Sequence, residues 1–174
     1  NLTGSLPVEL SNLTNLQQLH VYSNQISGTI PTWLGTLTQL IRLNLSYNQL
    51  LGSIPTQLGN LTALERLNLR NNLLTGGIPA EIGNLSSLLG LELRHNQLDG
   101  AIWAELGNLP LLQHLDLGDN QLSGNLPTEL GSLTYMILLD LGGNLLDGNL
   151  PAWFSNMTQL VYLGLERNDF SGPI

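Results

Sequence analysis

Histidine and aspartate side chains lie two residues apart in the middle of this sequence, in a pattern that could serve acid–base catalysis or metal binding. His114 and Asp116 alternate along one segment, and His95 and Asp119 stand near it. A His–Asp pair can transfer a proton or help to hold a metal ion. The chain has no cysteine, however, and only Ser and Tyr hydroxyls are available as nucleophiles on an open surface. We therefore interpret these residues as solvated pairs, and expect no enzyme activity, no cofactor and no metal.

The segments that must position these side chains repeat with a fixed period of 24 residues. Asn recurs at positions 24, 48, 72, 96, 120, 144 and 168, and Gly recurs at 4, 28, 52, 76, 100, 124, 148 and 172. The unit that starts at Leu64 reads L-x-x-L-x-L-x-x-N-x-L-x-G-x-I-P. A period of this length indicates a solenoid of stacked units that share one continuous core.

Alternation within the unit predicts a strand with one buried face. Leu67 and Leu69 are two residues apart and point inward, whereas Arg66, Asn68 and Arg70 point outward. About seven apolar positions of the unit face the core, which is too few for one unit to fold alone. These positions are Leu64, Leu67, Leu69, Leu74, Ile78, Ile82 and Leu85.

The remaining positions of the unit predict turns. We expect Asn72 to bond backbone groups of its own turn and of the next coil. Gly76 permits a conformation or a close approach that a Cβ would obstruct. Pro79 fixes φ and removes a donor, so the chain turns there. Residues 81–84 should then cross the back of the coil as a short 3₁₀ turn.

This pattern is identified as the leucine-rich repeat, and the resemblance covers the whole chain. The G-x-I-P element and the L-G-N-L-T segment at 58–62 resemble the plant-type subclass, which occurs in ectodomains of receptor-like kinases and in polygalacturonase-inhibiting proteins. The resemblance implies an α/β repeat fold, a curved right-handed solenoid with a parallel β-sheet on its concave face and loops or 3₁₀ turns on its convex face. We expect residues 1–174 to form a single solenoid of about seven units, and to be a piece of a longer protein that carries the caps.

The outward strand positions carry most side chains that could give specific binding. All five Arg, all three His and three of the four Tyr fall there, with six of the thirteen acidic residues. This face therefore has a net charge near −1, and the other seven acids lie on turns and the back. The candidate ligand-binding residues are His20, Tyr22, Arg42, Tyr47, Arg66, Arg70, Glu92, Arg94, His95, His114, Asp116, Asp119, Asp140, Tyr162, Glu166 and Arg167.

These observations predict a module that docks a protein or peptide ligand on its concave face, as part of a receptor or an inhibitor. Four glycines beside the acidic residues are expected to leave room for a ligand. They are Gly118, Gly142, Gly143 and Gly164. The opposing interpretation is that neighbouring charges only pair with one another, for example in a lattice of Glu65, Arg66, Glu92 and Arg94.

The sequence also leaves two alternatives to ligand binding. One is ice binding, since the resemblance extends to leucine-rich antifreeze proteins and a hydroxyl column recurs at Thr14, Thr38, Thr62, Ser86, Thr134 and Thr158. The repeat consensus also explains this column, and Pro110 breaks it. The other alternative is a structural spacer between further domains.

Sequons and charge bear on location and partners. N-x-S/T occurs at Asn1, and we predict glycosylation at Asn12, Asn44, Asn60, Asn84 and Asn156. An extracellular or cell-surface location is favoured, although the repeat consensus itself generates four of these sequons, so an intracellular one is not excluded.

The chain has no Lys and a net charge of −8, which disfavours nucleic acid. It also lacks an apolar run of membrane-spanning length, so we expect no membrane contact from this segment.

Overall fold

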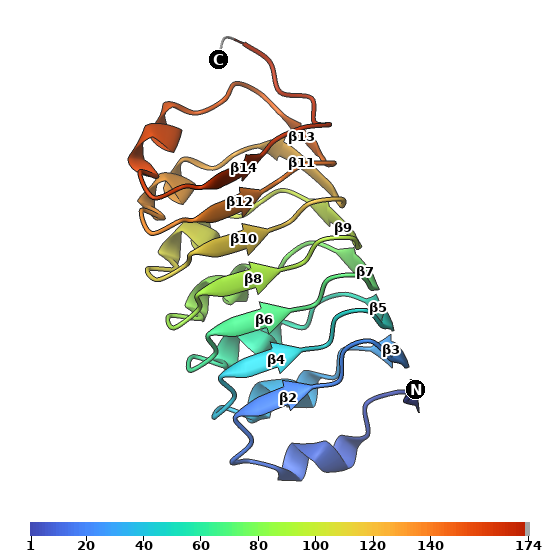
Figure 1. The fold of residues 1–174 in the computed structure, drawn as a ribbon. Coiled ribbons are helices and arrows are strands. Elements are labelled where there is room, and N and C mark those ends of the chain that lie inside the picture. Colours follow the sequence, from blue (N-terminus) through green and yellow to red (C-terminus); the bar gives the residue numbers. More distant parts are fainter. Residues whose placement is uncertain (173–174) are drawn as a thin grey trace.

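The computed structural model describes residues 1–172 and shows a regular stack of similar coils (Figure 1). Each of the first six coils consists of a 3₁₀ turn, a short strand, a tight turn and a second strand, and the last has the 3₁₀ turn and the first strand. We number the coils one to seven, so that η1 and β2 belong to coil one and η7 and β14 to coil seven. The first and last described residues lie at opposite ends of the stack. This is the curved right-handed solenoid that the repeat pattern predicts.

The first parallel sheet lines the inner face and has the order β14-β12-β10-β8-β6-β4-β2. Its strands are β2 (Gln18–His20), β4 (Arg42–Asn44), β6 (Arg66–Asn68), β8 (Gly90–Glu92), β10 (His114–Asp116), β12 (Leu138–Asp140) and β14 (Tyr162–Gly164). Equivalent residues pair across the sheet, as Arg42 pairs with Arg66 and Arg66 with Gly90. Side chains of successive coils therefore stand in columns along the stack.

A second parallel sheet of seven strands runs along another side of the stack, where the sequence analysis predicted turns only. Its strands are β1 (Thr3–Gly4), β3 (Gln25–Thr29), β5 (Gln49–Gly52), β7 (Leu73–Gly76), β9 (Gln97–Gly100), β11 (Gln121–Asn125) and β13 (Leu145–Asp147). Stacking brings equivalent extended segments of neighbouring coils side by side, so their backbone groups pair. One inward residue per strand, such as Leu74, leaves too little alternation to distinguish these strands from loops.

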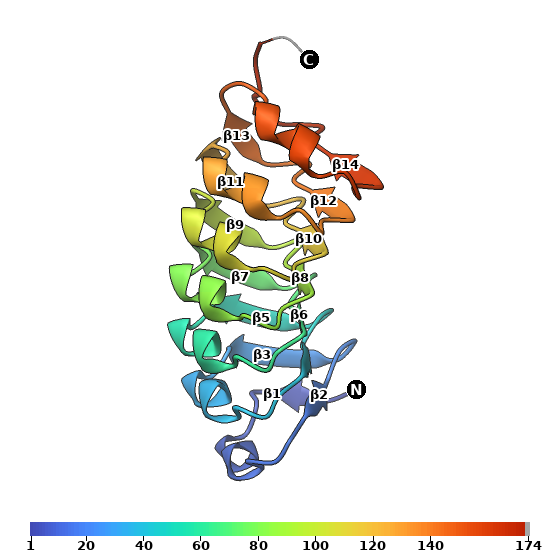
Figure 2. The same ribbon diagram turned by 90° about the vertical axis from the view of Figure 1, so that its left-hand side faces the viewer.

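Short 3₁₀ turns complete the coils and stack in one column (Figure 2). They are η1 (Val8–Asn12), η2 (Thr32–Thr36), η3 (Thr56–Asn60), η4 (Ala80–Asn84), η5 (Ala104–Asn108), η6 (Thr128–Ser132) and η7 (Ala152–Asn156). Pro79 precedes η4 in an extended conformation with φ −68° and ψ 139°. Trp103, at the corresponding position of η5, adopts nearly the same conformation, with φ −78° and ψ 147°.

The core is a continuous column of leucine and isoleucine. All seven predicted positions in the unit from Leu64 to Leu85 are buried, none more than 1% exposed. Arg66 is exposed, while Asn68 and Arg70 are half-buried. The predicted division of each strand into a core side and an outer side is confirmed.

The asparagine column satisfies backbone groups in two coils. The Asn72 Nδ2 donates to the carbonyl oxygens of Leu69, at 3.0 Å, and of Leu45, at 3.1 Å. Its Oδ1 accepts from the amide of Leu50 at 3.0 Å. Leu45 and Leu50 belong to the preceding coil, so the expectation that these side chains reach the next coil is wrong. The ladder runs backward because each Asn side chain points toward the turn that the chain has already completed.

Glycine serves two needs of the coil. Gly76 has φ +73°, a left-handed conformation that residues with a Cβ rarely adopt. At Gly59, a Cβ would lie 2.4 Å from the carbonyl oxygen of Glu81, so glycine permits close contact between successive 3₁₀ turns. Both roles anticipated for glycine therefore occur, but at different positions of the unit.

Candidate ligand-binding face

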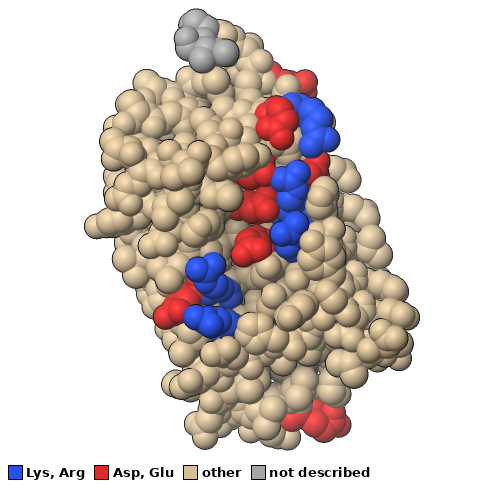
Figure 3. Space-filling model, viewed as in Figure 1, with Lys and Arg blue, Asp and Glu red and all other residues tan. Residues whose placement is uncertain are grey.

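Charged side chains form a mixed strip along the β2–β14 sheet (Figure 3). The strip divides into two parts with different chemistry. In coils four to seven, Arg and acidic side chains contact one another. In coils two and three, the Arg side chains form no ion pair among the described residues.

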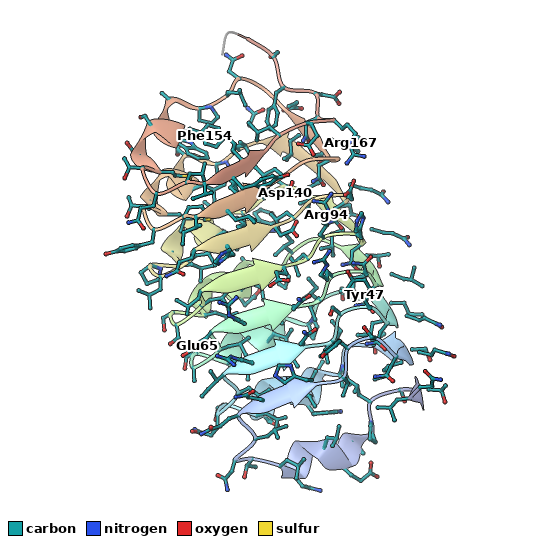
Figure 4. The ribbon with its side chains drawn as sticks, in the orientation of Figure 1. Tyr47, Glu65, Arg94, Asp140, Phe154 and Arg167 are labelled. Carbon is teal, nitrogen blue, oxygen red and sulfur yellow. The ribbon has the colours of Figure 1, made fainter. Side chains whose placement is uncertain are left out.

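The first part is a network around Arg94, whose position relative to Asp140 and Arg167 is shown in Figure 4. The two Nη atoms of Arg94 donate to Asp119 Oδ2, at 2.5 Å, and to Asp140 Oδ2. Arg167 Nη2 contacts Asp119 Oδ1 at 2.8 Å, and His95 Nδ1 lies 3.5 Å from Asp119 Oδ2. Asp119 thus links three cationic or ionisable side chains from coils four and seven.

Asp140 is the most deeply buried acid of this network. Its side chain is 6% exposed, and its Oδ1 accepts from the Gly142 amide at 3.0 Å. Burial lowers the pKa of Arg94, but the Asp140 and Asp119 carboxylates outweigh it and raise that pKa overall. The same Asp140 charge is the main cause of a raised pKa at Tyr162. The charged side chains of this network thus pair with one another within the chain.

The glycines of this region do not leave free space for a ligand. A Cβ at Gly118 would lie 3.0 Å from Arg94 Nη1, one at Gly142 2.7 Å from Glu166 Oε1, and one at Gly164 2.5 Å from Asp140 Oδ1. At Gly143 the nearest atom is Asp119 Oδ1, at 2.5 Å. The expectation of ligand space here is wrong, because the chain's own charged side chains occupy it.

The lattice suggested for Glu65, Arg66, Glu92 and Arg94 is wrong as well. These four side chains make no ion pairs with one another in the described part of the chain. Glu92 Oε2 accepts instead from Asn68 Nδ2 at 2.6 Å, and Arg94 turns toward the later coils. Charge pairing does occur on the strand face, but in coils four to seven.

The second part of the strip contains Arg42, Arg66 and Arg70. Arg42 and Arg66 stand side by side on β4 and β6. The guanidinium of Arg70 lies over the ring of Tyr47, with Cζ 5.4 Å from the ring centre, which is cation–π distance. Like charges on adjacent strands repel, so an anionic group from a partner would relieve this arrangement.

Two hollows open beside these arginines. The smaller, about 80 Å³, is lined by His20, Arg42, Leu43, Asn44, Arg66, Asn68 and Glu92. The larger, about 180 Å³, is lined by Arg66, Arg70, Glu92, His114, Asp116 and Leu138. Gly90 stands between Arg66 and His114 in the sheet, and a Cβ there would meet nothing closer than 3.7 Å. A small side chain at position 90 would therefore make only ordinary contacts with Arg66 and His114.

Polar atoms near the larger hollow lack partners. Arg70 Nε and His114 Nδ1 are buried and make no hydrogen bond to any described residue. Burial is the main cause of a raised pKa at Asp116, partly offset by the bond from the Gly118 amide. His114 and Asp116, which the sequence suggested as an acid–base pair, form no hydrogen bond with each other within residues 1–172. Buried donors without acceptors are costly, and a polar ligand group could satisfy them.

The backbone conformation of one column of this face was not recognised from the sequence. Residues just before the ladder asparagines have left-handed φ values between 51° and 67°. They are Ser23, Tyr47, Asn71, His95, Asp119, Gly143 and Arg167. Asn, Asp and Gly at three of the seven positions were the available signal, since these types tolerate this conformation. The bend turns Tyr47, His95, Asp119 and Arg167 along one rim of the strand face.

The remaining candidates lie in the first and last coils, where His20 also lines the smaller hollow. His20, Tyr22 and Glu166 are exposed, at the first and last coils of the sheet. Across residues 1–172, no group of three or more His, Asp or Glu side chains is arranged to hold a metal ion. The same residues include no helix with the length and apolar character needed to span a bilayer.

Models of known protein families identify the repeat that forms this architecture. Leucine-rich-repeat models match residues 14–74, and again 111–133 and 136–157. The chain is a leucine-rich-repeat protein. No curated protein sequence matches it. Its 3₁₀ turns and doubled sheet therefore belong to a known repeat architecture, and its strand face carries side chains that differ from unit to unit.

Plant receptors are among the most similar solved structures. The ectodomain of the Arabidopsis thaliana receptor kinase GASSHO1/SCHENGEN3, solved with CASPARIAN STRIP INTEGRITY FACTOR 2, is 40% identical with a TM-score of 0.98 over 99% of this chain. The plant peptide hormone receptor RGFR1, solved with RGF2, is 37% identical with a TM-score of 0.94 over 97% of this chain. This leucine-rich-repeat chain spans only 21% and 27% of those two chains.

A different activity is represented by one further structure. A plant ice-binding protein is 29% identical with a TM-score of 0.79, over 97% of this chain and 62% of its own. Proteins of this repeat class therefore use one scaffold for different purposes, and function must be argued from side chains.

Proposed function

We propose that this chain is a ligand-binding leucine-rich-repeat module that docks an acidic protein segment or peptide on coils two to five. The observation that carries the proposal is the contrast within one sheet face. Arg42, Arg66 and Arg70 lie beside two hollows without carboxylate partners among the described residues, whereas Arg94 and Arg167 are paired. An extracellular or cell-surface setting agrees with the receptor ectodomains that the chain resembles.

The geometry fits an extended segment that crosses the strands. Adjacent strands of a sheet lie about 4.8 Å apart, so coils two to five span about 15 Å. An extended segment of about five residues covers that distance. Its acidic group would face Arg42 and Arg66, and a second polar group would reach the larger hollow, where the Nε of Arg70 lacks an acceptor. Tyr47 offers apolar contact at the rim.

Selection from a displayed library of random peptides tests this proposal. The native chain should enrich acidic peptides, and their binding should weaken as salt rises, because the charges are partly exposed. The triple variant Arg42→Gln, Arg66→Gln and Arg70→Gln should lose these peptides. Failure to enrich any peptide, or equal binding to the triple variant, would refute the proposal.

A matched control separates local contacts from total charge. The triple variant Thr32→Glu, Thr56→Glu and Thr128→Glu changes the net charge by the same three units. These threonines are exposed on the 3₁₀ turns, away from the strand face. It should bind the selected peptides almost as the native chain does. A loss equal to that of the arginine variant would indicate a general charge effect rather than a site.

Ice binding is the second candidate, supported by the similarity to a plant ice-binding protein. The hydroxyl column is exposed at all six predicted positions, Thr14, Thr38, Thr62, Ser86, Thr134 and Thr158. Pro110 interrupts the column in coil five, and Tyr135 stands beside it with 51% exposure. These features make the surface less regular than an ice plane requires. Thermal hysteresis at millimolar protein concentration would establish this candidate, and its absence would remove it.

A further inference from the structure

The fold separates the sequons into two groups. Four asparagines each form the last residue of a 3₁₀ turn and are exposed: Asn12, Asn60, Asn84 and Asn156. No described residue hydrogen-bonds to any of their side chains. The hydroxyl residues two positions later, at 14, 62, 86 and 158, are exposed as well. Nothing in the fold obstructs a substituent on these four amide nitrogens.

The fifth sequon lies in a different environment. Asn44 is half-buried in β4, and its Oδ1 accepts from the Ser46 hydroxyl at 2.7 Å and from the Ser46 amide at 3.1 Å. Ser46 is only 3% exposed. His20 and Asn68 flank Asn44 on the adjacent strands, and the hollow that they share measures about 80 Å³. A sugar ring on Asn44 would have to displace these side chains.

We infer that the chain carries N-linked oligosaccharides at Asn12, Asn60, Asn84 and Asn156 and none at Asn44. The donor is an oligosaccharide linked to a lipid diphosphate, supplied with its transferase in the secretory pathway. The asparagine Nδ2 forms a bond to C1 of the first sugar. The bond from C1 to the diphosphate oxygen breaks, the lipid diphosphate leaves with the electron pair, and a base takes one amide proton. This inference does not depend on the proposed ligand-binding site.

The sugar-bearing positions lie in one row along the edge where 3₁₀ turns lead into the β2–β14 strands. Coils five and six form the longest gap in this row. Pro110 removes the sequon of Asn108, and Ser132 replaces the asparagine of coil six. In these coils the residue that follows is a large apolar one, Leu111 or Tyr135, with 46% and 51% exposure.

The other coils contain no exposed large apolar residue at this place. The equivalent residues are Asn15, Gln39, Ala63, Ser87 and Gln159. Coil two also lacks a sequon, since Thr36 replaces the asparagine, but its Gln39 is polar. Sugars on coils one, three, four and seven therefore leave an apolar stretch of this edge uncovered. The longest gap in the asparagine row thus coincides with the apolar stretch of this edge.

Site mapping tests the inference directly. The chain is secreted from eukaryotic cells behind a cleavable leader, with Asn1→Gln in every variant to remove the terminal sequon. Enzymatic deglycosylation in ¹⁸O-labelled water marks each occupied asparagine for mass spectrometry. We expect label at all four positions, Asn12, Asn60, Asn84 and Asn156. Label at Asn44, or any pattern lacking the expected positions, would overturn the inference.

Substitutions in the hydroxyl column provide matched controls. Thr158→Ala should remove the mass of one oligosaccharide, whereas Thr134→Ala, in the same column without an asparagine before it, should leave the mass unchanged. Pro110→Thr restores a sequon at the exposed Asn108 and should add one oligosaccharide. An unchanged mass for Pro110→Thr would contradict the claim that exposure at this position is sufficient. Circular dichroism of each secreted variant confirms that the solenoid is folded.

Discussion

The guanidinium group of Arg94 in coil four spans two coils to reach the buried carboxylate of Asp140 in coil six. On the way it also contacts Asp119, which Arg167 approaches from coil seven. One arginine thus connects coils that are not adjacent. The charges in this half of the strand face stabilise the stack, and those of coils two and three are left for a partner.

Removal of the Arg94 charge should destabilise the solenoid. Arg94→Met leaves Asp140, 6% exposed, without its cationic partner, and an unpaired buried charge costs about 3 kcal/mol. We expect a loss of that order in the free energy of unfolding, measured by urea denaturation. Adding Asp140→Asn should recover part of it, because the remaining amide is neutral. Equal stability of Arg94→Met and the native chain would show that the network is only a surface feature.

Substitution by alanine should destabilise the chain at one glycine of this sheet and have little effect at another. Gly164→Ala places a Cβ 2.5 Å from Asp140 Oδ1, and Arg94 with the Gly142 amide holds that carboxylate in place. Overpacking of this kind costs about 1–3 kcal/mol. Gly90→Ala meets only ordinary contacts, from 3.7 Å, and should change stability by about 0.5 kcal/mol or less. Thermal unfolding of the two variants compares them directly, and a reversed order would contradict the assigned contacts.

The asparagine ladder should be most sensitive in its buried middle. Asn120→Ala removes the acceptor of the Leu98 amide and the donor to three carbonyl oxygens, all buried. Unsatisfied buried groups cost about 1–3 kcal/mol each, so we expect a loss of about 3 kcal/mol. Asn24→Ala, at the more exposed first position, is the control and should cost about 1 kcal/mol. Equal losses would mean that burial does not set the cost.

Asp116 should make stability depend on pH. Burial raises its pKa above the ordinary value, so the folded state holds this proton more tightly than the unfolded state. Its contribution is therefore favourable below about pH 4 and is lost as pH rises through the raised pKa. Asp116→Asn should be more stable than the native chain at pH 7, and the difference should close on acidification. Urea denaturation at several pH values measures this difference, and a gap that widens toward low pH would contradict the sign.

The repeat period explains why the scaffold was predictable and much of the site was not. Leu67 and Asn72 recur in all seven units, and the Leu69 position is leucine in six and Val21 in coil one, so each position could be assigned from seven copies of the same environment. The partners of Arg94 depend instead on side chains in two later coils, and on Gly118, whose missing Cβ gives the guanidinium room. No period in the sequence encodes that contact. Each ion pair across the stack occurs at only one place in the chain, so it can be identified from the structure but not from the repeat.

The second sheet and the direction of the asparagine ladder were missed for a related reason. Both depend on how one coil is placed on the next. Leu74 and Gly76 fit an extended strand and a turn equally well, until stacking supplies a neighbour that pairs with the backbone. Asn72 can reach either neighbouring coil by its chemistry alone, and only the slope of the coil selects the preceding one.

Because the asparagine ladder repeats every 24 residues, one whole coil can be removed or inserted without shifting the phase of the others. Deleting residues 73–96 joins Asn72 to Gln97 and leaves every leucine and asparagine of the repeat in phase, because the excised segment is one period of 24 residues. The same deletion removes Glu92, which lines both hollows, and brings Arg66 beside His114. It also removes Arg94 from the charge network, so the excised coil changes the strand face and not the leucine core. Duplication or loss of single repeats during evolution could therefore exchange one recognition surface for another in one step, without any change to the core that holds it.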